Sequence, residues 1–431
     1  MDKVILVCVS LIILGLSWII YRRNFELFLC LLIAVYNNLF YLAPRIHGPE
    51  DYQLLLLPIV LILLVVNLFT RELAFGRYGW GIIAFLGISV FGVVVAWLIA
   101  GQGLSFGIKA AKLTPLVLVY FLLAGRRIES EKFASYFISM ALAVAFIALM
   151  QYFAHGRTNL FPGMPKEVID WQKGFNRVGV GQIVIAASTV VAFTRYQQSS
   201  RIIFLFAAIA LFAEVILVEQ IRGFIVGILL SMFVIYMLSH KLSSLRISVY
   251  IFFGCLCLCS WLLLSSFLSG DGFSNLSLVK RTQADFSKRG GSFGSSYQAR
   301  LNAYDYYWRQ IQKNPITGRG LWNFNWEGDN EKRLQQYQGI HLSDIGITHF
   351  IVQAGLIGSI WLVWGLLKLW KDIFQFRCQL AIASYYILAT FTMPTLDLFF
   401  RSDSLLLFAV FLGMSSKIIT ANKSYPVLAN G

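Results

Sequence analysis

Long apolar runs alternate with short polar segments along the chain. Residues 54–69, 81–100 and 202–218 are almost free of charged side chains. Crossing the hydrocarbon core takes about 20 mostly apolar residues in a helix, whereas a barrel strand shows roughly 10 residues of alternating polarity. The pattern therefore predicts an all-α, polytopic transmembrane bundle of twelve or thirteen spans, with candidate spans that begin near residues 4, 25, 53, 79, 110, 133, 178, 202, 223, 247, 347, 378 and 403.

Basic residues predict the orientation of these spans. Lys and Arg accumulate in short cytoplasmic loops, and alternate loops here, such as those with Arg22 and Arg126, hold more than twice as many as the loops on the opposite side. The opposite side holds Lys3, Arg45, Lys109, Lys112, Arg222 and Arg401. We therefore expect an external N-terminus, a cytoplasmic C-terminus and long external segments at 155–177 and 269–346.

Composition narrows the class of protein. Hydrophobic residues make up 58% of the chain and charged residues 13%, which excludes an ordinary water-soluble domain. The net charge of +15 is spread over short loops, so it predicts topology and no nucleic-acid partner. The six cysteines lie in or beside apolar runs, so we expect neither disulfides nor a metal site.

The predicted spans and loops divide the chain into three regions. Residues 1–268 contain ten predicted spans, residues 269–346 form one large external loop, and residues 347–431 contain the last spans and a short cytoplasmic tail. Within the loop, residues 287–296 have the composition of a flexible linker. Residues 296–311 then predict an amphipathic helix that ends before Asn314-Pro315, with a stripe formed by Leu301, Tyr304, Trp308 and Ile311.

Two arginines are candidates for binding a diphosphate. Arg222 lies between two apolar runs at the external membrane boundary, where a charge is costly and is usually functional or paired. A guanidinium can bind phosphate oxygens in a bidentate manner, and Arg300 in the loop helix could do the same. Alternatively, Arg222 pairs with Glu214 or Glu219, and Arg300 belongs to a solvated helix face.

The end of the loop delivers three possible general bases to the external membrane surface. His341, Asp344 and His349 immediately precede or begin a long apolar helix, and a carboxylate or imidazole near apolar surface can be tuned to accept a proton. Each could equally be an ordinary polar residue at a helix end, and Asp344 in particular has the character of an N-cap.

These residues resemble the O-antigen ligase and O-antigen polymerase family of bacterial envelope enzymes, which are glycosyltransferases of the GT-C type. The resemblance covers about residues 175–370. It rests on Ile221-Arg-Gly223 at the start of a span, on Arg300 and Trp308 followed by the residues Asn314 to Gly320, and on a polar turn before Gly355-Leu-Ile-Gly358.

The resemblance implies a metal-independent, inverting transfer of an oligosaccharide from an undecaprenyl diphosphate donor. The acceptor would be a hydroxyl of a glycan or of a lipid A-core, at the external face of the bacterial inner membrane. No cofactor is implied, and membrane lipid and polysaccharide-assembly proteins are the expected partners. Arg222 and Arg300 match the arginines that engage the diphosphate. The family's histidine falls on Asp344 here, between His341 and His349, so the base and the choice between ligase and polymerase stay open.

Two weaker features complete the candidate set. Asn176 to Gln182 is similar to the family's polar start of a helix, which makes Arg177 a secondary candidate for phosphate binding. Asp397 and Arg401 are spaced by one helical turn and are expected to pair at the outer surface.

The rival function is a transporter or flippase of lipid-linked sugars. Transporters commonly show ionisable residues within the membrane, broken helices and repeats between halves. Glu214 is the clear carboxylate deep in a predicted span, and the two halves of the sequence show no repeat. The sequence thus favours the enzyme. A sensor or scaffold would need a sizeable cytoplasmic domain, and the predicted internal loops are short.

Overall fold

The computed structural model describes residues 17–39, 51–70, 72–126, 128–154, 160, 178–239, 296–323, 326, 345–375, 380–400 and 404–424. Within these ranges the chain forms thirteen α-helices and no β-strand, which confirms the all-α class. Helices are expected in a membrane because every backbone N–H and C=O in hydrocarbon needs a hydrogen-bond partner, and a helix supplies these partners within its own segment.

The helices follow one another with short connections in the described parts. Their bounds are α2 Phe25–Tyr36, α3 Asp51–Phe69, α4 Gly79–Ala100, α5 Leu104–Ala111, η1 Thr114–Leu118, α6 Val119–Gly125, α7 Ser130–Phe153, α8 Gln182–Ser199, α9 Ile202–Glu214, the π-helical turn η3 Val215–Glu219, α10 Arg222–Ser239, α13 Ser296–Lys313, α15 Thr348–Gln375, α16 Leu380–Thr392 and α17 Leu405–Ser424.

Six segments in the described residues are long and apolar enough to cross a membrane. They are α4, the continuous run of α5, η1 and α6, α7, α9 with η3, α10 and α15. Shorter apolar helices lie at Phe25–Tyr36, Leu56–Phe69, Leu380–Thr392 and Leu405–Ser416. The chain is therefore a multi-span helical membrane protein. The spans expected near residues 4 and 247 begin outside the described residues.

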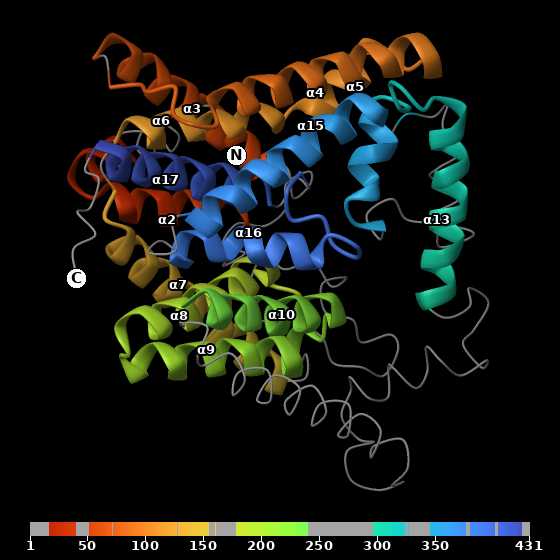
Figure 1. The fold of residues 1–431 in the computed structure, drawn as a ribbon. Coiled ribbons are helices and arrows are strands. Elements are labelled where there is room, and N and C mark those ends of the chain that lie inside the picture. Colours follow the sequence, from red (N-terminus) through yellow and green to blue (C-terminus); the bar gives the residue numbers. More distant parts are fainter. Residues whose placement is uncertain are drawn as a thin grey trace, which may run out of the picture.

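The helices run roughly side by side (Figure 1), with α8, α9 and α10 on one side of the bundle and α3, α4 and α5 on the other. Helix α8 packs against α7, α9, α10 and α16, and nearly all of its apolar side chains are buried. Because neighbouring helices shield it, α8 can carry Ser188, Thr189 and Arg195, which would be costly against lipid.

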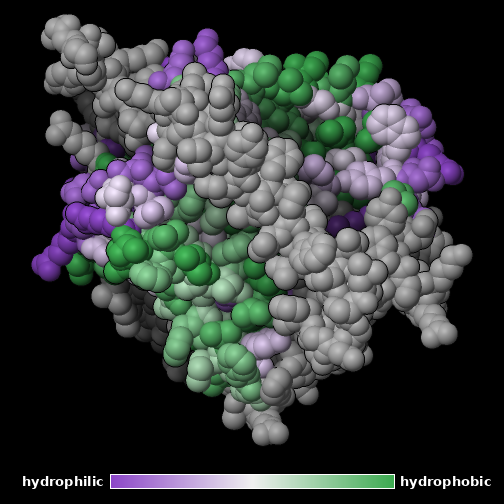
Figure 2. All heavy atoms as spheres, turned by 60° about the horizontal axis from the view of Figure 1, so that its bottom comes forward, coloured by the Kyte–Doolittle hydropathy of each residue, from purple (hydrophilic) through white to green (hydrophobic). Residues whose placement is uncertain are grey.

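The outer faces of the spans expose large apolar side chains. Val90 and Leu98 on α4 and Ile203 and Phe206 on α9 are each more than half exposed. Figure 2 shows apolar side chains gathered in two areas of one face, below its centre and at its upper right, with hydrophilic ones toward its left and right edges. Such a surface would be unfavourable in water, and it fits a chain that is surrounded by lipid.

Helix α15 is broken at Gly355, where φ is 57° and ψ is −151°. The first part, from Thr348 to Ala354, lies beside α13 at one end of the bundle, and the longer second part runs along the bundle (Figure 1). The sequence predicts one uninterrupted helix here. The break was not predicted because mean hydropathy carries no information on backbone dihedral angles.

The loop after α13 satisfies the backbone groups that the break exposes. The amide of Leu356 donates to the carbonyl of Pro315 at 2.8 Å, and the amide of Ile357 donates to Ile316 at 3.3 Å. On the other side of the break, Val352 accepts a hydrogen bond from Arg319. Residues 314–320 therefore restore the hydrogen bonds that a broken helix loses inside a membrane.

Close approach of this loop to α15 and α4 requires glycine. A Cβ atom on Gly318 would lie 2.6 Å from the amide nitrogen of Gly355, and one on Gly320 would lie 2.4 Å from that of Ala96. Both glycines have positive φ, which side chains disfavour. The Gly-Arg-Gly sequence thus lets the loop reach the backbones of two spans.

Helix α13 crosses one end of the bundle instead of running along it (Figure 1). It ends at Lys313, before Asn314-Pro315, as the sequence predicts. Its most deeply buried residues are Ala303 and Tyr307, which pack with Trp322, Ile345 and Val352 in a small second core. The predicted stripe lies only partly on the packed face, because Leu301 and Trp308 are exposed.

Candidate functional site

The turn between α16 and α17, residues 393–400, is where the described candidate residues meet; we call it the α16–α17 turn. Met393 accepts a hydrogen bond of 2.9 Å from the amide of Ile347, just before α15. A Cβ atom on Gly346 would lie 2.0 Å from the Met393 carbonyl oxygen, so only glycine permits this approach. The stretch that leads into α15 is therefore fixed against the turn.

Asp397 in this turn lies beside His349. The carboxylate oxygen Oδ1 accepts hydrogen bonds from the amides of Phe399 at 2.9 Å and Phe400 at 3.0 Å, which orients the group. The other oxygen, Oδ2, lies 3.5 Å from Nδ1 of His349. The Asp397 side chain is 3% exposed and that of His349 is 23% exposed. The Asp397 carboxylate is thus buried, while part of the His349 imidazole stays exposed.

The expected exposed pair of Asp397 and Arg401 is wrong in the part that can be examined. Asp397 is buried, and residues 396–400 are not helical, so the spacing of one helical turn does not apply. The carboxylate is drawn inward because it accepts the two amides of the turn. Arg401 lies outside the described residues.

Arg222 begins α10 on another side of the same turn. A Cβ atom on the next residue, Gly223, would lie 2.6 Å from Oγ1 of Thr395 and 3.1 Å from Cδ1 of Leu396. The glycine therefore brings the start of α10 into direct contact with the turn. A helix N-terminus carries partial positive charge, which adds to the charge of Arg222 at this place.

Arg300 lies one helical turn before Tyr304 on α13, and Tyr304 contacts the α16–α17 turn. The Tyr304 hydroxyl donates a hydrogen bond of 2.5 Å to the carbonyl of Pro394. Burial raises the pKa of the Tyr304 phenol above its ordinary value, and this rise is opposed by the nearby charge of Arg300 and a hydrogen bond from Thr348. Tyr304 therefore stays a donor at physiological pH, and Arg300 lies close enough to influence it.

Arg222, Arg300 and His349 thus come from three helices that all pack at the α16–α17 turn. The other sequence-based candidates, Arg177, His341 and Asp344, lie outside the described residues. Asp397, Thr348 and Gly346 were not expected at the site. The sequence holds a weak signal for Asp397, since an aspartate shortly after Pro394 is typical of a polar turn between helices.

Of the two alternative partners of Arg222, Glu214 does not provide the pairing, and the pairing with Glu219 stays a prediction. Both carboxylate oxygens of Glu214 are buried, and they have no hydrogen-bond partner among the described residues. Glu214 is followed at once by the π-helical turn η3, which ends at the buried residue Glu219. Wider turns of this kind occur frequently at functional sites.

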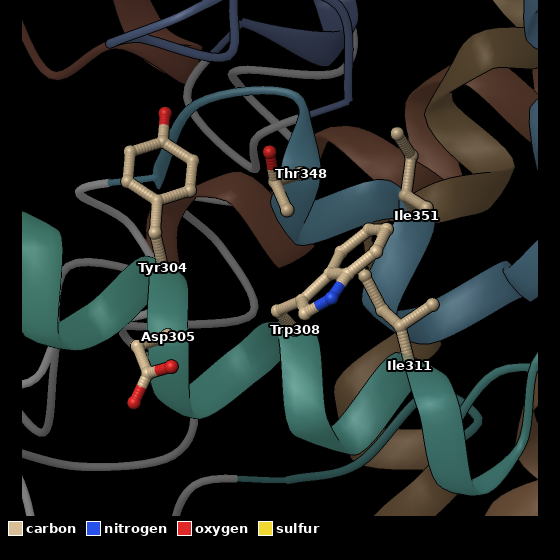
Figure 3. A pocket seen from close by; sticks show the side chains of 6 residues that line it. All are labelled: Tyr304, Asp305, Trp308, Ile311, Thr348 and Ile351. Carbon is tan, nitrogen blue, oxygen red and sulfur yellow. The ribbon is translucent and has the colours of Figure 1, made fainter.

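An open cavity of about 460 Å³ adjoins the site between α13 and the first part of α15. We call it the α13–α15 groove; its lining residues are Tyr304, Asp305, Trp308, Ile311, Thr348 and Ile351. In Figure 3 the indole of Trp308 and the side chains of Ile311 and Ile351 lie near one another at one end, while the Tyr304 and Thr348 hydroxyls lie at the other end.

The described residues contain no group of three or more His, Cys, Asp or Glu side chains that could hold a metal ion. No protein-family model matches the chain, and no curated protein matches its sequence at a significant level.

Proposed function

We propose that the protein transfers an oligosaccharide from an undecaprenyl diphosphate donor to a sugar hydroxyl, as O-antigen polymerases and ligases do. The observation that carries this proposal is the pairing of His349 with buried Asp397 at a turn that also contacts the starts of α10 and α15 and the side of α13. This arrangement supplies a base and two cations, Arg222 and Arg300, to one end of the bundle.

The chemistry follows from these groups. An acceptor hydroxyl attacks the anomeric carbon, the bond from that carbon to the diphosphate oxygen breaks, and undecaprenyl diphosphate leaves. His349 takes the hydroxyl proton, and the Asp397 carboxylate stabilises the imidazolium that forms. Arg222 and Arg300 stabilise the negative charge on the departing diphosphate. Attack opposite to the leaving group inverts the anomeric carbon.

The location of the site agrees with this reaction. The positive charge of the short loops predicts that the end with Arg222, His349 and α13 faces the external side, which is the periplasm if the membrane is a bacterial inner membrane. A lipid-linked donor and a glycan or lipid A-core acceptor would meet there without a nucleotide. His341 and Asp344 in the preceding loop remain rival bases.

Substitution of the two arginines tests the proposal in cells. We expect Arg222→Ala and Arg300→Ala each to abolish glycan assembly while the protein still inserts in the membrane. Lys313→Ala is the matched control, because Lys313 is a basic residue on the same helix as Arg300 that is exposed and does not line the α13–α15 groove. Glycan would be measured by gel electrophoresis and membrane insertion by immunoblotting of the membrane fraction.

Full glycan assembly in both arginine variants would contradict this mechanism. Single substitutions of His341, Asp344 and His349 in the same assay identify the base. A loss confined to His349 is the result expected from its contact with Asp397.

Transport of a lipid-linked sugar is the second candidate, and two observations favour it. Helix α15 is broken within a membrane-length segment, and Glu214 is buried within another. Both features occur in transporters. In proteoliposomes, a transporter would move a fluorescent lipid-linked sugar between leaflets without an acceptor, and Glu214→Gln would slow this movement. The proposed enzyme would need the acceptor, and Glu214→Gln would leave its product yield unchanged.

A further inference from the structure

The α13–α15 groove has a polar end and an apolar end. The lining residues of α13 are Tyr304 and Asp305, then Trp308, and then Ile311, so the polarity of the lining falls toward the C-terminus of the helix. Arg300 precedes this lining by one helical turn. The facing part of α15 repeats this order, with Thr348 opposite the polar end and Ile351 opposite the apolar end (Figure 3). A ligand that fits this gradient has a charged head and a hydrocarbon tail.

We propose that the groove binds the first isoprene units of the lipid-linked donor, with the diphosphate at the Arg300 end and the chain leading away past Trp308, Ile311 and Ile351. This inference rests on the proposed function. It goes further, because it assigns the chain to named residues and fixes the direction in which the donor lies.

The polar groups of the groove are already engaged, which argues against a sugar ring as the occupant. The Asp305 carboxylate accepts a 2.7 Å hydrogen bond from Arg309. The Tyr304 hydroxyl donates to Pro394, and Thr348 hydrogen-bonds Tyr304. A sugar would leave its hydroxyls poorly matched here at a cost in free energy, whereas a hydrocarbon chain needs only apolar contact.

Charge and size agree with a lipid diphosphate. Arg300 offers a guanidinium next to the polar end, and such a group can bind phosphate oxygens in a bidentate manner. The volume of about 460 Å³ lies within the range of roughly 300–1,000 Å³ that holds small ligands. The groove therefore accommodates the part of the chain nearest the diphosphate, and the rest extends into the bilayer.

Affinity measured against chain length tests this assignment. The full-length protein in phosphatidylcholine nanodiscs is titrated with inorganic diphosphate, geranyl diphosphate and geranylgeranyl diphosphate, and binding to empty nanodiscs is subtracted. We expect affinity to rise with chain length in the unaltered protein. Trp308→Ala, which removes apolar contact, and Ile351→Trp, which fills the groove, should each weaken geranylgeranyl diphosphate binding about tenfold.

Three controls separate the groove from the phosphate site. Inorganic diphosphate should bind Trp308→Ala and Ile351→Trp as well as it binds the unaltered protein, which also shows that both variants are folded. Arg300→Ala should weaken the binding of all three ligands. Leu301→Ala, an exposed apolar position on the same helix that does not line the groove, should change none of them.

The outcomes distinguish the groove assignment from the proposed function on which it rests. Equal affinity for all three ligands, or a chain-length effect that survives in both groove variants, overturns the groove assignment and leaves the arginine mechanism standing. Competition by phosphatidylglycerol as effective as that by geranylgeranyl diphosphate also overturns it, because the groove would then be a general lipid contact. Failure of every diphosphate to bind overturns both the groove and the donor site.

Discussion

At the scale of single residues, Asp397 links the stability of the α16–α17 turn to the proposed chemistry. One of its oxygens accepts the amides of Phe399 and Phe400, and the other lies beside His349. A buried carboxylate is costly unless its oxygens are matched by donors or cations. The hydrogen bonds from the two turn amides to Oδ1 explain why the side chain is buried although the sequence predicted an exposed ion pair. Oδ2 accepts no hydrogen bond within the described residues and is the atom that faces His349.

Replacement of Asp397 separates its two roles. Asp397→Asn keeps an oxygen that can accept the turn amides, so we expect folding to persist and glycan transfer to fall at least tenfold. His349→Ala should lower turnover by about 10²–10⁴-fold, the range typical of a lost general base. Asp397→Ala loses the amide acceptor as well and should lower the free energy of unfolding by about 1 kcal/mol more.

Turnover of the purified variants and their thermal unfolding in detergent measure the two effects. Unchanged turnover in both Asp397→Asn and His349→Ala would remove this pair from the mechanism and direct attention to His341 and Asp344.

The sequence predicted Arg222 and His349 as candidates because charged or ionisable residues at the edge of an apolar run are conspicuous, and it predicted Arg300 through the family resemblance. It could not show that they share the α16–α17 turn, because that meeting depends on close contacts made by Gly223 and Gly346. These glycines act through the absence of a side chain, and nothing in hydropathy or charge distinguishes them from glycines that face open space.

At the scale of secondary structure, the break in α15 positions the site. It separates the short first part, which bears His349 and lines the groove, from the long second part. Residues 314–320 stabilise the break by supplying the missing backbone partners. The sequence predicted the helices themselves and the end of α13, since both depend on local patterns, but the break depends on a loop some 40 residues away in the chain.

Alanine substitutions in α15 test this role of Gly355. Gly355→Ala introduces a Cβ 2.3 Å from the amide nitrogen of Gly318 at a backbone conformation reserved for glycine. We expect it to lower the free energy of unfolding by about 2 kcal/mol. Gly365→Ala is the matched control in the same helix. Its Cβ would meet open space, so stability should stay the same or rise by up to about 1 kcal/mol.

Thermal unfolding of both variants in the same detergent compares them directly. Equal melting temperatures for Gly355→Ala and Gly365→Ala would show that the break is not a fixed feature of the fold.

At the scale of the whole molecule, hydropathy predicted the fold class, and the described residues confirm it. Lipid requires helical spans whatever their packing, so long apolar runs suffice for that prediction. Helix α8 shows the limit of the method. It is less apolar than the six membrane-length segments, yet it occupies the interior of the bundle because four neighbouring helices cover it. A helix that is covered by other helices, unlike one that faces lipid, cannot be recognised simply from its composition.

The central claim is that one end of this bundle transfers a lipid-linked oligosaccharide. It is tested most directly by reconstituting the purified protein in liposomes with a synthetic undecaprenyl diphosphate oligosaccharide and a hydroxyl acceptor. We expect release of undecaprenyl diphosphate in equal amount to a glycan product with an inverted anomeric linkage, and loss of both in Arg300→Ala and His349→Ala. Movement of the intact donor between leaflets with no glycan product would contradict the claim and identify the protein as a transporter.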